Sequence, residues 1–147
     1  MLRIRKILCP VDDTLLSLHV LDSAISLAER YEAHLIMLFV RREVANETND
    51  EEEVLVTTAG MQQLVSDRIA AVKLGAGIDC SVVLRTGNPA EAIRLAALEG
   101  GVDIVVMGTH GRNGIGDWLR GSTTERVMAT LDVPLLILRE RNEHDRE

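Results

Sequence analysis

Aromatic residues are nearly absent from this chain of 147 residues, which contains one Trp, one Tyr and one Phe. A core must therefore be built from aliphatic side chains, because hydrophobic residues still make up 46% of the sequence. Aliphatic cores are typical of parallel β-sheets covered by helices, since their buried strands are nearly continuous runs of Val, Leu and Ile. The length suits one domain and leaves no room for two.

Cysteine is also scarce, and Cys9 and Cys80 are too few to make a disulfide framework. No apolar run approaches the ~20 residues that cross a bilayer. The basic start of the chain leads into an apolar stretch that Pro10, Asp12 and Asp13 interrupt, which does not fit a signal peptide. We therefore expect a cytoplasmic protein with no membrane partner.

Basic residues are outnumbered, with 16 Lys and Arg against 23 Asp and Glu and a formal net charge of −7. An acidic surface repels phosphate backbones, so nucleic acid is not expected as a partner. The four histidines, at positions 19, 34, 110 and 144, show no metal-ligand spacing with one another or with the cysteines. No metal site is expected from these side chains.

Aliphatic runs and helical patterns alternate along the chain. This alternation predicts right-handed crossovers and a parallel sheet with helices on both faces. An acidic run at 50–53 belongs either to an exposed loop or to the first turn of the next helix. The expected strands are 4–11, 34–40, 78–85, 102–107 and 133–138, and the expected helices are 15–31, 54–74, 89–99 and 122–131.

Two helix starts carry capping signals. Asn88-Pro89-Ala90-Glu91 places Asn at the N-cap, Pro at the first helical position and Glu three residues after the cap. Ser122-Thr123-Thr124-Glu125 has the pattern of a second capping box, and Gly100-Gly101 is expected to end the first of these helices.

The two cysteines fall in the first and third expected strands. If the second strand lies between them, they are roughly 9–10 Å apart, because neighbouring strands are ~4.8 Å apart. A disulfide needs Cα atoms within about 7 Å, so we expect none, and we expect both thiols to be buried.

A ligand site is expected beyond the carboxyl ends of the strands, where the winding of an open parallel sheet reverses. Three segments must meet there: the turn after the first strand (10–13), the end of the second strand at Val40, and the long loop after the fourth strand (107–121).

That loop, 108–121, contains five glycines and leads into the helix that starts at Ser122. Glycines let the backbone approach a ligand closely, and the unpaired amides of a helix N-terminus attract anions. The hydroxyls of Ser122, Thr123 and Thr124 add donors. This is the chemistry of a phosphate cradle, although no Lys precedes Ser122 as in a P-loop. Equally, the glycines make turns and Ser122 caps its helix.

The spacing in this loop resembles a known signature. Gly108-Thr109-His110-Gly111, nine residues, then Gly121-Ser122 is similar to the ATP-binding motif of universal stress proteins. Segments 7–12 and 133–138 resemble the opening and closing strands of that family, so the resemblance covers about 5–139.

The resemblance implies one domain over 1–147 with a core at about 5–139. It implies an adenine nucleotide alpha hydrolase-like, Rossmann-like α/β fold, with an open five-stranded parallel sheet of order 3-2-1-4-5. ATP, with Mg²⁺ as a possible companion, is the implied ligand, and a homodimer through the last strand, Val133 to Leu138, is the implied assembly. An aliphatic strand at a sheet edge favours such pairing on physical grounds as well.

The implied nucleotide contacts fall into three groups. Pro10, Val11 and Asp12 line the adenine and ribose site, Val40 packs on adenine, and Met107 and Gly108 contact the nucleoside. The phosphate contacts are His110, Gly111, Gly121, Ser122 and Thr123, with Thr124 as a weaker candidate.

Some of these residues have a plainer interpretation. Asp12 equally caps the helix that follows, Val40 taken by itself is a core residue, and His110 equally is a solvated loop residue. The chain also departs from the family, because Asp12-Asp13-Thr14 replaces the common Asp-Gly-Ser. The extra carboxylate of Asp13 weakens nucleotide binding unless it points to water.

Catalysis is not indicated. The Gly-x-Ser-x-Gly elbow of hydrolases is missing, and no residue stands out as orienting water for an ATPase. We expect a nucleotide-dependent switch or sensor in stress regulation, with at most slow hydrolysis. The alternatives are a dimeric interaction or chaperone-like module of the same fold that binds no nucleotide, and an adenylating enzyme.

Overall fold

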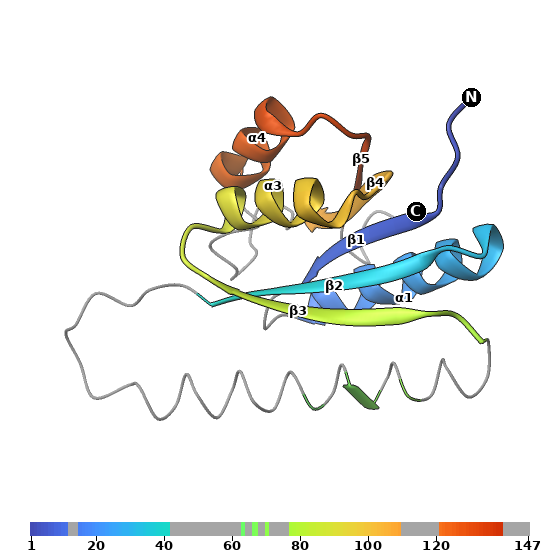
Figure 1. Cartoon of the computed structure of the whole chain (residues 1–147). Coiled ribbons are helices and arrows are strands. Elements are labelled where there is room, and N and C mark those ends of the chain that lie inside the picture. The colour runs from blue at the N-terminus through green and yellow to red at the C-terminus, as the bar shows by residue number, and fades with distance from the viewer. Residues whose placement is uncertain are drawn as a thin grey trace, which may run out of the picture.

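The computed structural model describes residues 1–11, 15–41, 63, 66, 67, 70, 77–109 and 121–139. Strands and helices alternate along the described chain except between β2 and β3, where the predicted helix 54–74 lies almost entirely outside the described residues (Figure 1). In chain order they are β1 (Lys6–Val11), α1 (Leu15–Tyr31), β2 (His34–Arg41), β3 (Cys80–Thr86), α3 (Pro89–Gly100), β4 (Ile104–Thr109), α4 (Gly121–Thr130) and β5 (Leu135–Arg139).

The strands form one parallel sheet of order β3-β2-β1-β4-β5. Helix α1 packs on one face, while α3 and α4 pack together on the other (Figure 1). The predicted fold class, the strand order and the placement of helices on both faces are therefore confirmed. The most interior strand, β1, has a neighbour on each side, and its residues after Lys6 are all buried.

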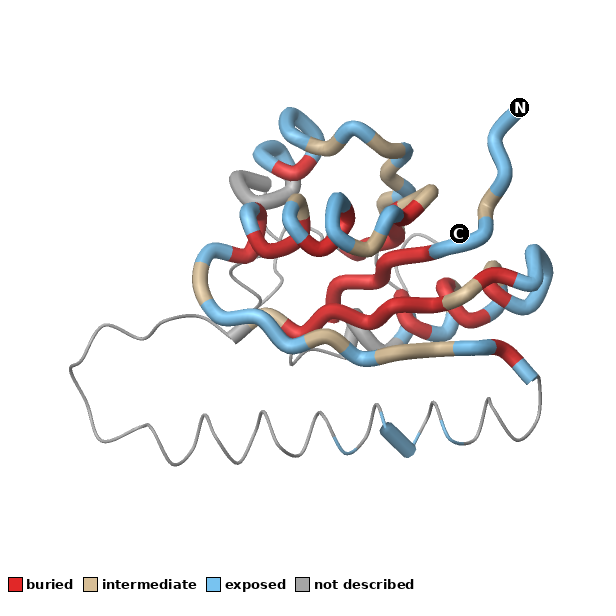
Figure 2. The backbone as a smooth tube through the Cα atoms, viewed as in Figure 1, coloured by how far each residue is buried: buried red, intermediate tan, exposed pale blue. Residues whose placement is uncertain are grey.

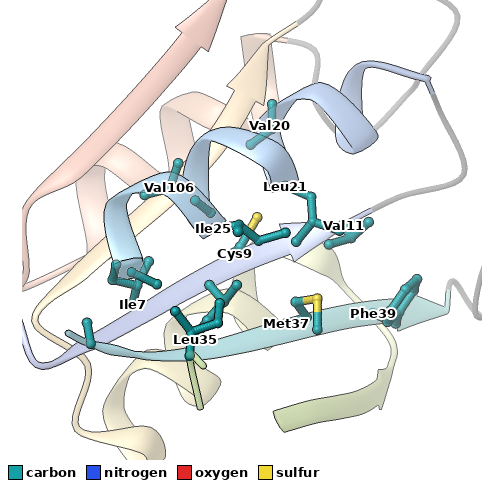
Figure 3. Close-up of a cluster of buried hydrophobic side chains, with 14 residues drawn as sticks. Ile7, Cys9, Val11, Val20, Leu21, Ile25, Leu35, Met37, Phe39 and Val106 are labelled. Atoms are coloured by element: carbon teal, nitrogen blue, oxygen red, sulfur yellow. The ribbon is translucent and has the colours of Figure 1, made fainter. Parts of the chain in front are cut away.

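One core layer lies between α1 and the sheet (Figure 3). Alternate residues of β1, Ile7, Cys9 and Val11, point into it because successive side chains of a strand face opposite sides. Leu21 and Ala24 of α1 meet them, and both are fully buried. The helix forms here because its apolar residues recur at the helical period and cover this half of the sheet.

The second core layer lies under α3 and α4 and takes the other face of the strands. Alanines dominate the inner surface of α3, and their small size lets the helix approach the strands closely. Figure 2 shows the buried residues following the central strands and the inward sides of the helices. This layer includes Leu8, Leu38, Ala90, Ile93, Ala96, Ala97, Met107 and Val127.

The predicted ends of α3 are confirmed. The Asn88 side chain accepts a hydrogen bond from the Glu91 N–H at 3.2 Å, and Gly101 ends the helix with φ at 57°. That left-handed conformation suits glycine. Arg94 bonds the Glu91 carboxylate and holds its pKa below the usual value.

Four strands begin about two residues later than predicted. The reason is that apolar residues before these strands pack in the core, although their backbones do not pair with a neighbouring strand. Ile78 and Val102 are buried in this way, and Ile4 is partly buried. Asp103 lies immediately before β4 and links it to the start of β1. Its carboxylate accepts from the Arg5 and Lys6 N–H groups at 2.8 and 3.0 Å.

The cysteines form no disulfide, as predicted. Cys9 pairs with Met37, and Leu35 pairs with Cys80, so β2 lies between them. Cys9 is buried, but the expectation for Cys80 is wrong, since this thiol is only partly buried. The reason is its position on β3, which is an edge strand of the sheet.

Within the described part of the chain, no helix has the length and apolar character needed to cross a membrane.

Replacing Leu21 with Ala tests the layer under α1. Leu21 is fully buried, so Leu21→Ala should lower the free energy of unfolding by about 2–5 kcal/mol through lost burial and a residual cavity. Urea denaturation measures this. Leu98→Ala is the matched control, because Leu98 is 68% exposed and its loss should change stability by no more than about 0.5 kcal/mol. Equal effects of the two substitutions would contradict the described packing.

Candidate functional site

The hydrogen-bonded ladder of the sheet opens between β1 and β4. Their ladder holds two residue pairs, Ile7 with Ile104 and Leu8 with Val105. By contrast, β1 stays paired with β2 over six residues, to Val11. β4 stays paired with β5 to Thr109. Within the described residues, the ladder between β1 and β4 therefore ends before their carboxyl ends, whereas each strand stays paired with its outer neighbour.

Pro10 supplies a reason for this opening. The Arg5 carbonyl accepts from His34 on β2, and the Lys6 carbonyl accepts from Asp103 at the start of β4. Backbone groups of successive strand residues point to opposite sides, so the even-numbered residues of β1 face β4. The nitrogen of Pro10 thus lies on the β4 side and carries no hydrogen to donate. The ladder ends where its next donor is missing.

The opening lies where the winding of the sheet reverses. From β1 the chain proceeds to β2 and β3 on one side, and β4 then lies on the other side of β1. Connections diverge at such a point, which leaves a crevice at the carboxyl edge of the sheet. The expected position of the site therefore coincides with the break in the β1–β4 ladder.

Three of the predicted side chains share the face of α3 and α4. Met107 is fully buried in that core layer, and Val40 packs against the layer while remaining partly exposed. Pro10 alternates with Leu8 and faces the same way. These residues form an apolar floor at the carboxyl ends of the three central strands.

Val11 faces the opposite way. Its side chain is fully buried in the layer under α1 (Figure 3). Only its backbone groups therefore remain as candidate ligand contacts. Gly108, which is buried in β4 beside Leu138 of β5, also presents backbone alone.

Helix α4 begins at Gly121, one residue before the predicted start. Gly121, Ser122, Thr123 and Thr124 make up its first turn, where backbone N–H groups have no partner within the helix. Because α4 connects two parallel strands, it runs back against them and its first turn lies at their carboxyl edge. The helix packs through Val127, which is fully buried beside α3.

The structure brings together part of the predicted site. Pro10, Val11, Val40, Met107 and Gly108 meet at the carboxyl ends of adjacent strands, and the first turn of α4 lies at the same edge. Asp12, His110 and Gly111 lie outside the described residues. Sequence reasoning missed the break in the ladder, although a proline inside an apolar strand was its signal.

Cys9 lies on β1 but faces the layer under α1, where it is fully buried and burial raises its pKa to about 12. No group of three or more His, Cys, Asp and Glu residues in the described ranges is placed to hold a metal ion. At the carboxyl edge, the described residues provide apolar side chains and the positive end of a helix dipole.

An open parallel sheet of this order, with helices on both faces and a crevice at the reversal of winding, defines a Rossmann-like α/β protein. The chain belongs to the universal stress protein family, whose profile matches residues 3–139. The universal stress protein YxiE of Bacillus subtilis is 29% identical in an alignment 147 positions long, which covers 91% of this chain and 98% of that protein.

Solved structures agree on the fold. The universal stress protein UspA from Lactobacillus plantarum superposes with a TM-score of 0.76 at 24% identity, over 93% of this chain and 99% of that one. A universal stress protein in complex with cAMP has a TM-score of 0.70 at 21% identity, over 92% and 97% of the two chains. A family member from Arabidopsis thaliana with AMP bound has a TM-score of 0.62 at 14% identity, over 97% and 95%.

The raised pKa of Cys9 leads to a labelling test. In the folded protein the thiol stays protonated and buried, so iodoacetamide at about pH 8 should leave Cys9 unmodified, whereas urea-unfolded protein should react. Above about pH 8.5 the thiolate forms more readily in the unfolded chain, so stability should decline as pH rises toward the folded pKa. Peptide mass spectrometry identifies the modified residue, and rapid labelling of folded protein would contradict the described burial.

Proposed function

We propose that this protein binds an adenine nucleotide, ATP with Mg²⁺, in the crevice between β1 and β4. The observation that carries the proposal is the ladder between these strands, which stops after two pairs at the point where the winding of the sheet reverses. Structural relatives whose descriptions name cAMP and AMP as bound ligands support the adenine nucleotide class.

The apolar floor suits the base. A purine ring packs favourably on aliphatic side chains, and Pro10, Val40 and Met107 provide these at one face of the sheet. Backbone groups of Val11 and Gly108 are the hydrogen-bonding partners that we assign to the nucleoside. We assign Asp12, by its position after β1, to the ribose hydroxyls.

The first turn of α4 suits the phosphates. Its free N–H groups and the positive end of the helix dipole attract anions, which matters in a chain of net charge −7. We assign this role to Gly121, Ser122 and Thr123, with Thr124 beside them. The glycine signature adds His110 and Gly111.

In this proposal the protein is a nucleotide-dependent regulatory switch of the cytoplasm, built as one domain over 1–147. Nucleotide stabilises one arrangement of the crevice through its differential affinity, and that arrangement is what a partner reads. Hydrolysis is at most slow, because the described site supplies binding groups rather than an activated nucleophile. ATP turnover at rates typical of dedicated enzymes, on the order of 10 s⁻¹, would contradict this part.

Calorimetric titration with ATP and Mg²⁺ tests the proposal. The native protein should bind, and Gly111→Val or Gly121→Val should weaken binding tenfold or more, since a branched side chain blocks close approach of phosphate to the backbone. Gly77→Asn is the matched control. Gly77 has φ at 65°, which Asn tolerates, an added Cβ meets nothing within 4 Å, and the residue precedes β3 at the opposite edge.

Titrations with ADP, AMP and cAMP identify which nucleotide is preferred. Adenine nucleotide released from the denatured, freshly purified protein would add independent support. Absence of binding heat for all four nucleotides, with the protein folded by circular dichroism, would overturn the proposal. The same fold would then be a dimeric interaction or chaperone-like module.

We further propose a homodimer through β5. This strand lies at the edge of the sheet, and none of its described side chains is fully buried. Leu136 is 37% exposed, and Met128 on the adjacent α4 is 61% exposed. Pairing with a second copy would cover both the edge and these apolar groups.

Light scattering measures the mass directly. The native protein should have the mass of a dimer at micromolar concentration, and Leu136→Lys should shift it toward a monomer by placing a charge in the interface. Leu98→Lys, on α3 and 68% exposed, should leave the mass unchanged. A monomeric native protein would contradict the assembly while leaving the nucleotide site untouched.

A further inference from the structure

A hydrogen-bonded array of Asp79, His34 and Ser81 lies at the amino end of the sheet, at the edge opposite the proposed nucleotide crevice. His34 Nδ1 is 3.0 Å from Asp79 Oδ2, and His34 Nε2 is 2.9 Å from Ser81 Oγ. The imidazole thus contacts a carboxylate through one ring nitrogen and a hydroxyl through the other. The same sequence of contacts occurs in the Ser-His-Asp triad of serine hydrolases.

Strand pairing holds these three residues in place. The His34 N–H donates to the Arg5 carbonyl at 2.8 Å, which ties β2 to the start of β1. The Leu35 N–H donates to the Asp79 carbonyl at 2.9 Å, and Ile36 pairs with Ser81. Asp79 and Ser81 are two residues apart, so their side chains leave the same face of β3 and flank the imidazole.

The solvent exposure of these side chains limits the reactions that the array can support. The His34 side chain is 27% exposed and Ser81 is partly buried, so solvent reaches the pair. Asp79 is 84% exposed, and water screens its charge. Its electrostatic contribution is therefore smaller than that of a buried carboxylate, so we expect activity only toward substrates with good leaving groups.

We infer that Ser81, His34 and Asp79 form an acyl-transfer site for small activated carboxylic esters. Ser81 Oγ attacks the ester carbonyl carbon while His34 Nε2 takes the hydroxyl proton. The carbon–oxygen bond to the leaving group then breaks, and the leaving group departs with the bonding electrons. An alkoxide takes the proton back from His34, a phenolate leaves that proton to solvent, and Ser81 carries the acyl group. Neutral His34 then takes a proton from water, the hydroxide attacks the acyl carbon, and the bond to Ser81 Oγ breaks. Ser81 receives its proton from His34, and the carboxylic acid is released. Asp79 acts as a positioning residue that orients the ring.

The test uses the full chain with p-nitrophenyl acetate. Mass spectrometry after an acid quench should find an acetyl group on the peptide that contains Ser81, and p-nitrophenolate should appear in a burst. Ser81→Ala should abolish the burst. His34→Gln, which keeps a polar side chain, should slow acetylation about a hundredfold because the general base is gone.

Two controls separate this site from background reaction at the surface. Ser23→Ala removes a serine of α1 whose hydroxyl donates a hydrogen bond to the His19 carbonyl at 3.3 Å. His19→Gln removes an exposed imidazole that lies outside the array. Both should leave the Ser81 acetylation rate unchanged.

Asp79 is tested by rescue. Asp79→Asn should slow acetylation about tenfold, while Asp79→Glu should restore part of the rate because a carboxylate again reaches the ring. The inference is overturned if native protein carries no acetyl group on Ser81, or if Ser81 is acetylated equally fast in His34→Gln. Either result would mean that the array has only a structural role, which is to join β2 to β3.

Discussion

The missing N–H of Pro10 is the constraint on which the functional architecture depends. A parallel sheet is strongest when every strand is paired along its full length, and β1 achieves this with β2 over six residues. On the other side the ladder with β4 has two pairs. Because the nitrogen of Pro10 faces β4 and cannot donate, the ladder between the two strands ends where the winding reverses, which is the place where open parallel sheets bind ligands.

The aliphatic core allows such an opening without loss of the fold. Each face of the sheet has its own buried layer, one under α1 and one under α3 and α4. β1 and β4 are therefore held by packing from both faces and by their outer neighbours. The described part of the site is therefore carried by strands and a helix, and placement on such elements favours preorganised binding of a ligand.

Much of the fold was predictable because it depends on local signals. Helix α1 matches its predicted range, and the Asn88 cap forms as the sequence pattern indicates. Strand starts were less predictable, because an apolar residue such as Val102 indicates that the position is buried but not whether its backbone pairs with a neighbouring strand. The His34 and Ser81 contact was not predictable at all, since it joins residues 47 positions apart through the register of two strands.

Local patterns along the chain were enough to establish the class of fold, the order of the described elements and the resemblance to universal stress proteins. Periodicity, capping and glycine spacing are properties of neighbouring residues, so they can be recognised without a structure. Tertiary structure alone decided which backbone groups of β1 face β4, and therefore where the ladder ends. It also decided that Val11 faces away from the site and that His34 meets Asp79 and Ser81, because each of these depends on strand register.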